Sequence, residues 1–289
     1  MEEKWTVLKV LQWTTEYFHQ KGIEQPRTNA EVLLAHVLGM ERILLYLNFD
    51  RPLTPGELAS YRGLIRRRAA REPTQYITGK QEFWSLELEV TPSVLIPRPE
   101  TELLVEKAIG LVGAKSKSVL DLGTGSGAIA IALAHACPAL RIVAADSSLA
   151  ALLVARRNAS RHALNAHITF VATDLFKGFS SIGKPFDLII SNPPYIADND
   201  YPLLAPEITE YEPTTALLAG VDGLVVIRRI IEEAPAYLKA GGSLLVEIGA
   251  GQAEILRAEL TANPLIDQFE FIQDYSGVMR VLHIRKHSI

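Results

Sequence analysis

The chain has 289 residues, 48% of them hydrophobic, which is enough to bury a full core in one large domain or two unequal domains. Its formal net charge of −4 argues against a dedicated duplex-DNA binder, because such proteins usually carry a strongly basic surface. One cysteine, Cys137, excludes an internal disulfide, and the lack of a secretion-signal pattern or a long apolar run predicts a soluble, cytoplasmic protein that neither spans nor anchors in a membrane.

Residues 1–72 are expected to form a small all-helical domain. Apolar side chains recur at helical spacing over 5–20, residues 28–31 resemble a cap for a helix over 32–38, and Thr54 and Glu57 have the spacing of a capping box. This last helix ends in a basic cluster. We favour the interpretation that these cations lie in solvent and complement the carboxyl end of the helix over the interpretation that they contact an RNA or an RNA-bound partner. The cluster consists of Arg66, Arg67, Arg68 and Arg71.

Residues 73–95 are expected to form a β-hairpin linker. Pro73 breaks the helical pattern, and residues 77–90 read as a hairpin with its turn at Gly79 and Lys80. Phe83 and Trp84 could line a substrate channel, but packing of the hairpin onto the next domain is favoured. The hairpin therefore separates the helical domain from the remainder of the chain.

Residues 96–289 alternate strands with helices, which predicts an α/β domain with a Rossmann-like, mostly parallel sheet. The final two strands are joined by the short segment 273–277, which favours an antiparallel hairpin and places one reversed strand in the sheet. Cys137 is expected as a small buried residue on a helix. The predicted strands are 118–122, 141–145, 168–171, 186–191, 243–248, 269–272 and 278–284, and a helix is expected to open near Asp222.

The motif Asn192-Pro193-Pro194-Tyr195 directly follows the strand over 186–191. Proline has no backbone N–H and a fixed φ, so the Asn192 side-chain carbonyl and the Pro193 backbone carbonyl form a rigid pair of acceptors that match a planar NH2 group. Tyr195 offers a flat face beside them. A turn that merely holds a packed tyrosine fits the same four residues, so the choice depends on the context.

That context is a strand, a glycine-rich turn and a helix over residues 118–130. Glycines let the backbone approach a ligand closely, and the helix that follows presents unpaired N–H groups to it. Asp146 ends the next strand, where a carboxylate can accept hydrogen bonds from ribose hydroxyls. Both turns lie at the carboxyl ends of strands and are therefore expected to face one crevice.

The glycine pattern alone would also fit a protein that binds a nicotinamide dinucleotide. Gly123, Gly125 and Ala128 have the spacing of the dinucleotide-binding fingerprint in its Gly/Ala form. Asp121 favours S-adenosylmethionine instead. A carboxylate at that position can pair with the amino group of a methionine moiety, whereas it would repel a pyrophosphate.

The two motifs together resemble the class I S-adenosylmethionine methyltransferases, and several further blocks are similar to the peptide-chain release factor glutamine methyltransferases of the PrmC/HemK type. The resemblance implies a seven-stranded catalytic domain and methyl transfer to the side-chain amide nitrogen, N5, of the glutamine in the Gly-Gly-Gln motif of bacterial class I release factors. S-adenosyl-L-homocysteine would be the product, with neither a metal nor a covalent intermediate. The blocks are residues 71–79, 82–84, 95–102, 211–217 and 245–249.

The resemblance also implies roles for individual residues. Leu175 departs from relatives that have an aromatic residue there, and Arg98 and Glu100 either roof the pocket or belong to a solvated, proline-stiffened loop. The implied cofactor-binding residues are Asp121, Gly123, Thr124, Gly125, Ser126, Gly127, Asp146, Asp174, Leu175 and Asn192. The implied catalytic residues are Asn192, Pro193 and Tyr195, with Pro194, Arg98 and Glu100 added for substrate binding.

Two alternatives stay open from the residues themselves. A nucleic-acid adenine-amino methyltransferase would use the same motif on a flipped adenine, although the chain has no obvious target-recognition domain. A non-catalytic cofactor-binding protein would keep the glycine turn but would not need the acceptor turn. We expect a monomer without stable nucleic-acid binding, in which the helical domain selects the release factor.

Overall fold

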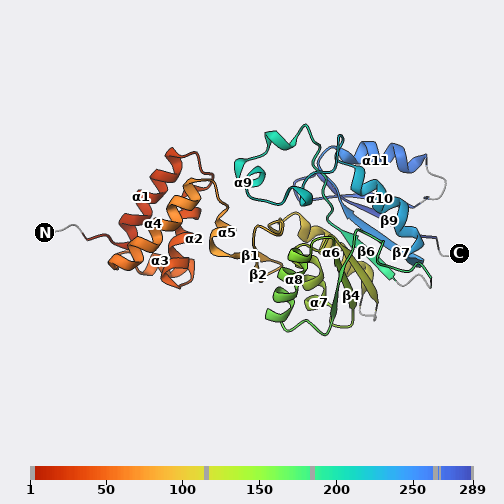
Figure 1. The fold of residues 1–289 in the computed structure, drawn as a ribbon, viewed down its shortest axis with the longest axis horizontal. Helices are drawn as coiled ribbons and strands as arrows, with labels where there is room; N and C mark the ends of the chain where they lie inside the picture. The colour runs from red at the N-terminus through yellow and green to blue at the C-terminus, as the bar shows by residue number, and fades with distance from the viewer. Residues whose placement is uncertain (1–3, 114–116, 183–185, 263–265, 267, 288–289) are drawn as a thin grey trace. The chain divides into compact units, whose positions relative to one another are not determined.

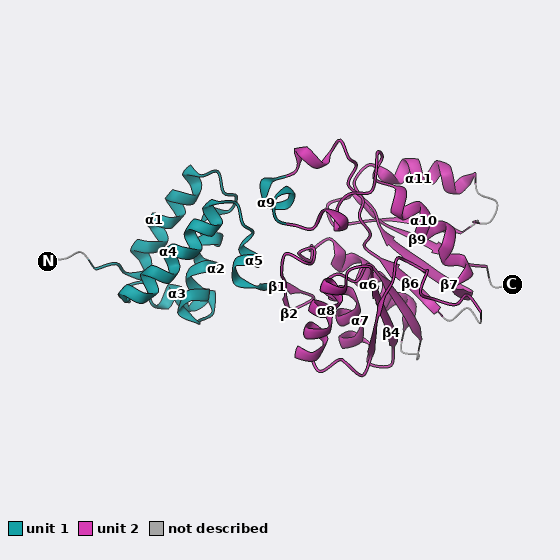
Figure 2. Ribbon diagram, viewed as in Figure 1, with its two compact units in different colours: residues 1–80, 205–211 teal, residues 81–204, 212–289 magenta. Residues whose placement is uncertain are grey.

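The computed structural model describes residues 4–113, 117–182, 186–262, 266 and 268–287 (Figure 1). The chain forms two compact units (Figure 2). The helical unit comprises Met1–Lys80 and Ala205–Tyr211, and the sheet unit comprises Gln81–Leu204 and Glu212–Ile289. Residues 1–3, which open the segment assessed for a secretion signal, lie outside the described residues. Over the part of the chain that is described, no helix has the length and apolar character needed to cross a membrane.

The helical unit is held together by an apolar core between its longer helices. The predicted capping box is confirmed, since Thr54 Oγ1 accepts from Glu57 N and Glu57 Oε2 accepts from Thr54 N. Phe18, Leu33 and Tyr61 lie fully buried in this core. The helices are α1 (Val7–Gln20), α2 (Pro26–Leu38), α3 (Arg42–Leu47), α4 (Pro55–Ala69), α5 (Thr74–Thr78) and, from the second segment, α9 (Pro206–Thr209).

The start of α2 differs from the prediction. The helix begins at Pro26 rather than after a cap at 28–31. Proline suits the first helical position because its missing N–H would be unpaired there anyway. Asn29 lies inside the helix, and its side-chain amide donates to the carbonyls of Glu24 and Gln25.

Arg68 corrects the interpretation of the basic cluster as a solvated helix end. Its side chain is buried, donates to Asn29 Oδ1 at 3.0 Å and pairs with Glu207 at 2.8 Å. Arg71 contacts the same carboxylate at 3.2 Å, and the Tyr211 hydroxyl donates to the Ala70 carbonyl at 2.6 Å. These contacts explain why the segment Ala205–Tyr211 belongs to the helical unit although it lies far along the chain.

The hairpin also differs from the prediction. Gly79, with φ +73°, ends the short helix α5, and the turn falls instead at Trp84 and Ser85, both with positive φ, between β1 (Lys80–Phe83) and β2 (Leu86–Glu89). Two central residues with positive φ are typical of a type I′ hairpin turn. The helical unit therefore extends to Lys80, beyond the expected boundary at 72. Phe83 is buried in the core of the sheet unit and Trp84 packs against it, as predicted.

The sheet unit contains a seven-stranded sheet in the order β5-β4-β3-β6-β7-β9-β8. β9 runs antiparallel to both β7 and β8, whereas the other pairings are parallel, which confirms the expected fold class. β7 begins five residues earlier than expected. The strands are β3 (Ser118–Leu122), β4 (Arg141–Asp146), β5 (Ile168–Ala172), β6 (Phe186–Ser191), β7 (Leu238–Glu247), β8 (Phe269–Gln273) and β9 (Met279–Arg285).

Helices cover both faces of this sheet (Figure 1). Because side chains alternate along a strand, Val119 packs into one core and Leu120 into the other. Cys137 lies just after α7 and is half-buried against the first core, so it is neither helical nor fully buried as expected. One core contains α6 (Thr101–Val112), α7 (Ala128–Ala136) and α8 (Leu149–Arg161), and the other contains α10 (Val225–Glu233) and α11 (Gln252–Thr261).

Candidate active site

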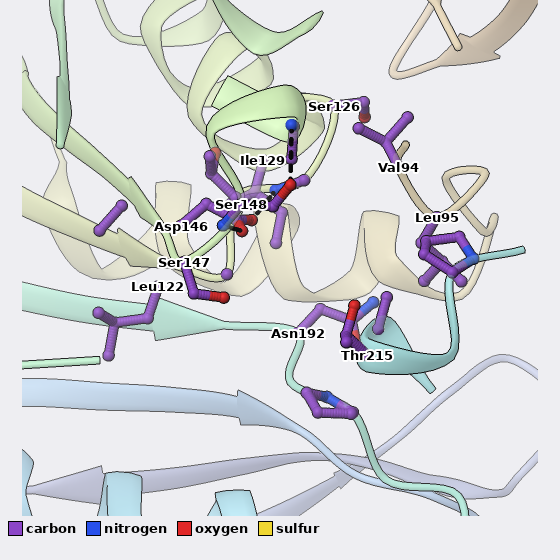
Figure 3. A pocket seen from close by; sticks show the side chains of 18 of the residues that line it. Val94, Leu95, Leu122, Ser126, Ile129, Asp146, Ser147, Ser148, Asn192 and Thr215 are labelled. Atoms are coloured by element: carbon purple, nitrogen blue, oxygen red, sulfur yellow. Dashed lines mark hydrogen bonds between the residues drawn. The ribbon is translucent and has the colours of Figure 1, made fainter. Parts of the chain in front are cut away.

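A cavity of about 240 Å³ lies in the sheet unit at the carboxyl ends of β5, β4, β3 and β6 (Figure 3). Both sequence motifs contribute to its wall, as expected for turns at the same edge of a parallel sheet. The predicted residues that line it are Gly123, Thr124, Gly125, Ser126, Asp146, Asp174, Leu175, Asn192 and Pro194.

The glycine turn is tied to the neighbouring strand by its own backbone. The amides of Gly123 and Thr124 both donate to the Ala145 carbonyl, at 2.8 and 3.0 Å. Gly127 precedes α7 with φ +84°, and a Cβ there would lie 3.0 Å from Ile131 Cδ1 and 3.1 Å from Ala155 Cβ. A side chain at this position would both strain the backbone and push α7 away from α8.

Asp146 lies on the cavity wall beside this turn (Figure 3). Its Oδ2 accepts from Gly125 N at 2.9 Å and its Oδ1 accepts from Ser148 N at 2.8 Å. Each carboxylate oxygen has a second lone pair and can accept a further hydrogen bond. The carboxylate is thus held in place and still able to accept from a ligand hydroxyl.

Asp121 lies beneath the turn, and the structure does not bring it to the cavity surface. Its side chain is fully buried, Oδ2 accepts from the Thr124 hydroxyl at 2.6 Å, and Oδ1 has no hydrogen-bond partner among the described residues. Burial raises the pKa of this carboxyl to about 7, against the opposing effect of Thr124. Thr124, rather than Asp121, lines the cavity.

Asp174 and Leu175 follow β5 and line the cavity near α10. A hydrogen bond from Lys177, with Arg229 nearby, holds the pKa of Asp174 below its usual range. Leu175 adopts φ +46°, a left-handed conformation that is uncommon for a branched residue. The turn that presents these two side chains is therefore locally constrained.

The Asn192 turn leaves β6 next to the glycine turn. Ser191, the last residue of β6, donates from its hydroxyl to the Leu122 carbonyl at 2.8 Å, which joins the ends of β6 and β3. Asn192 Nδ2 donates to Thr101 Oγ1 at 3.0 Å. Asn192 and Pro194 line the cavity, while Pro193 is buried and its side chain is not among the described lining residues.

Tyr195 is not among the described residues that line the cavity. Its hydroxyl lies 3.5 Å from Glu247 Oε1, and burial raises its pKa to about 12. Its carbonyl accepts from Gln252 Nε2 at 3.0 Å. The structure thus places this phenol against a buried carboxyl group, whereas the sequence suggested a flat face beside the substrate.

Two loops beside the cavity are joined through Glu212. This buried carboxylate accepts from Ile96 N at 3.2 Å and from the Arg98 guanidinium, and residues 93–95, 97, 213, 215 and 216 around it line the cavity. Arg98 therefore ties one loop to the other. Neither Arg98 nor Glu100, which directly precedes α6, is among the described lining residues.

Several polar residues at the site were not predicted. Thr101, Glu247 and Gln252 contact the Asn192 motif, although they lie far from it in sequence. A glutamate at the end of the apolar strand β7 is the one signal that could have indicated a special position. Within the described ranges, no group of three or more His, Cys, Asp or Glu side chains could hold a metal ion.

The seven-stranded sheet with one reversed strand, and a cavity over its glycine and Asn192 turns, define the class as a Rossmann-like methyltransferase. The family model "Methyltransferase small domain" matches residues 99–209, and the model "PrmC N-terminal domain" matches residues 9–79. Together with the high identity to curated relatives, these matches show that the chain belongs to the release factor glutamine methyltransferase family.

Relatives named release factor glutamine methyltransferase match over nearly the full length. The protein from Geobacter sulfurreducens is 48% identical over 280 residues, covering 97% of this chain and 96% of the relative. The protein from Chlorobaculum tepidum is 44% identical, with 97% of each chain covered.

One solved structure has a similar fold, and a second solved structure has a related name. The hMettl16 catalytic domain in complex with MAT2A 3′UTR hairpin 6 has a TM-score of 0.58 at 18% identity, covering 78% of this chain and 82% of that one. A release factor-specific protein-(glutamine-N5) methyltransferase from Alicyclobacillus acidocaldarius is 30% identical, with a TM-score of 0.42 and coverage of 69% and 99%. The similarity to the hMettl16 domain concerns the fold alone, because the sequence identity is only 18%.

Proposed function

We propose that this enzyme transfers a methyl group from S-adenosyl-L-methionine to the side-chain amide nitrogen, N5, of the glutamine in the Gly-Gly-Gln motif of bacterial class I release factors. The observation that carries the proposal is the position of Asn192 on the cavity wall beside the glycine turn. Membership of the release factor glutamine methyltransferase family supports the same substrate.

The cavity residues fit this cofactor. The Gly123–Gly127 turn and the Thr124 hydroxyl would hold its methionine part, and Asp146 would accept from the ribose hydroxyls. Asp174 and Leu175 would border its adenine. Asp121, whose Oδ1 has no hydrogen-bond partner among the described residues, would act on the cofactor through the Thr124 hydroxyl, which it holds in place. S-adenosylmethionine, when bound, supplies an electrophilic methyl group and leaves as S-adenosyl-L-homocysteine.

Asn192 would promote the reaction by orienting the amide group of the substrate glutamine. Its Oδ1 and the Pro193 carbonyl would accept the two hydrogens of the glutamine NH2, which favours a pyramidal nitrogen with a localised lone pair. This orientation would present the nitrogen to the methyl group that bound S-adenosylmethionine supplies, and the proton that the nitrogen loses would pass to solvent water. Positioning supplies the main part of the acceleration, and no covalent enzyme intermediate forms.

We also propose that the enzyme acts as a monomer in the cytoplasm, without stable nucleic-acid binding. Release factors act in translation, which takes place in the bacterial cytoplasm, so a cytoplasmic enzyme would meet this substrate. In this proposal the helical unit, which contains none of the described lining residues, selects the protein substrate.

One assay separates this proposal from its main alternative. The enzyme is incubated with methyl-labelled S-adenosylmethionine and, in parallel, a bacterial class I release factor, the same factor with its Gly-Gly-Gln glutamine changed to glutamate, and duplex DNA. We expect label on the glutamine alone, located by peptide mass spectrometry. Label in the DNA, or on the altered factor at an equal level, would overturn the proposal.

A further inference from the structure

A buried carboxyl group lies behind the Asn192 turn. Glu247 is the last residue of β7 and is 1% exposed. β7 runs parallel to β6, with Val246 opposite Ser191 in the register, so Glu247 and Asn192 leave the sheet at neighbouring positions. The methyl-transfer mechanism gives this glutamate no role, and a buried carboxyl group is costly unless other groups compensate it.

Thr101 lies between Glu247 and Asn192. This first residue of α6 is buried on most sides and lines the cavity. Its Oγ1 accepts from Asn192 Nδ2 at 3.0 Å, and the Thr101 side chain lies close enough to Glu247 to lower the pKa of that carboxyl group. On the other side the Tyr195 hydroxyl is 3.5 Å from Glu247 Oε1, and Oε2 has no partner among the described residues.

The hydrogens that Glu247, Thr101 and Asn192 can donate determine which of these side chains donates to which. A carboxylate only accepts, and a threonine hydroxyl has a single hydrogen to donate. When that hydrogen is directed at Glu247, the oxygen of Thr101 can only accept, so Asn192 must turn its NH2 towards Thr101. Its Oδ1 then faces the other way. A reversed Asn192 amide would present N–H donors to a substrate NH2, which cannot accept them.

We infer that Thr101 donates its hydroxyl hydrogen to Glu247, and that both are positioning residues that fix the orientation of the Asn192 amide, so that Oδ1 faces the NH2 group of the substrate glutamine. The inference rests on the proposed function. Glu247 acts only through Thr101, and Thr101 acts through Asn192. Together they supply the rigid support that an oriented acceptor needs.

The charge of Glu247 makes this orientation depend on pH. Burial raises its pKa to about 7, with Glu100 adding to the shift, while Thr101, Arg280 and Tyr195 oppose it. These groups come from α6 and the residue before it, from β9 and from the loop after β6; Arg98 also acts on Tyr195. A protonated Glu247 has a hydrogen of its own to donate to Thr101, so the direction is no longer fixed. The orientation is therefore held above about pH 7 and lost as the pH falls through that value.

The test compares Thr101→Val, which keeps the shape and removes the hydroxyl, with Thr101→Ser, which keeps the hydroxyl. We expect Thr101→Val to lower kcat on the release factor about 10- to 100-fold, as loss of a supporting hydrogen-bond partner commonly does, and Thr101→Ser to retain most of the rate. In an Asn192→Ala background, Thr101→Val should cause no further loss, because its effect passes through Asn192. Equal rates for the two Thr101 variants, or an additive loss in the Asn192→Ala background, would overturn the inference.

Glu247→Gln provides a second route if the Thr101 variants fold poorly. Glutamine can donate as well as accept, so we expect a lower kcat and loss of the acid limb near pH 7 from the profile of kcat. A wild-type rate and profile would contradict the role of Glu247. If wild-type enzyme places no label on the release factor, the proposed function is wrong. If wild-type enzyme does label the release factor but the Thr101 and Glu247 variants have the same kcat and pH profile as wild type, only the positioning inference is wrong.

Discussion

Asp121 and Glu247 are fully buried carboxyl groups at the two turns of the site, and burial raises the pKa of each to about 7. Both have one oxygen without a hydrogen-bond partner among the described residues. A raised carboxyl pKa means that the folded state keeps a proton that the unfolded chain has already released. Such groups therefore reduce stability as the pH rises, which is a cost tolerated at functional sites.

Glu247→Gln should stabilise the protein at neutral and alkaline pH. The ordinary pKa of 4.5 is raised to about 7 in the folded protein, so wild type loses stability between these values as the pH rises. The neutral variant does not, and its Tm relative to wild type should increase from pH 5 to pH 8. Differential scanning calorimetry measures this, with the exposed Glu232→Gln as the control. A Tm difference independent of pH would contradict the raised pKa.

The sequence indicates the residues of the site that come directly after strands. Gly123, Asp146 and Asn192 stand at strand ends within recognisable motifs, and the structure brings all three to one cavity. Thr101, Glu247 and Gln252 could not be predicted in the same way, because the fold alone brings them to the motif. The motifs point to Asp121 and Tyr195, but the burial of their side chains depends on packing that the motifs do not encode.

At the scale of elements, Asn158 on α8 ties the hairpin to the glycine turn. It is fully buried, accepts from Glu89 N at 2.6 Å and donates to the carbonyls of Glu89 and Ser126, both at 2.9 Å. These contacts join β2, α8 and the turn that precedes α7. The hairpin thus supports the cofactor side of the cavity as well as linking two parts of the chain.

Asn158→Ala should destabilise the sheet unit by about 2–4 kcal/mol, because it leaves buried backbone groups unpaired. Asn165→Ala, an exposed position just after the same helix, should change stability by less than about 0.5 kcal/mol. Urea denaturation followed by far-UV circular dichroism measures both. Equal midpoints for the two variants would show that Asn158 does not hold these elements together.

The strands of the sheet are predictable from the sequence because apolar runs with abrupt ends have few other interpretations. Short elements are harder to predict. The helix α3 has only six residues and no capping hydrogen bond from a side chain, and α5 lies within the range predicted as the hairpin linker. Gly79 suggests a turn between strands, but a glycine with positive φ also ends helices, and here it ends α5.

At the scale of the whole molecule, the chain passes twice through the helical unit. Glu207, from the segment Ala205–Tyr211, pairs with the buried Arg68 and with Arg71. The pairing lowers the pKa of Glu207 against the effect of burial. The local sequence assigns these arginines to solvent, because their acidic partner lies more than a hundred residues away in sequence.

Glu207→Ala should weaken the helical unit, since it leaves Arg68 buried without its carboxylate; breaking such a pair commonly costs about 3–5 kcal/mol. Hydrogen exchange should become faster for the backbone amides of α4. The exposed neighbour Glu210→Ala serves as the matched control and should leave exchange unchanged. Indistinguishable exchange in the two variants would mean that this ion pair does not stabilise the unit.

The central claim, that the acceptor turn after β6 carries out the transfer, is tested most directly by the single-turnover rate of Asn192→Ala on a bacterial release factor. We expect a loss of about 100-fold or more, as for removal of one oriented polar group in an active site, with cofactor affinity by calorimetry within a few-fold of wild type. The same change at Asn199, an exposed residue of the following loop, should leave the rate unchanged. A near-normal rate for Asn192→Ala would contradict the account.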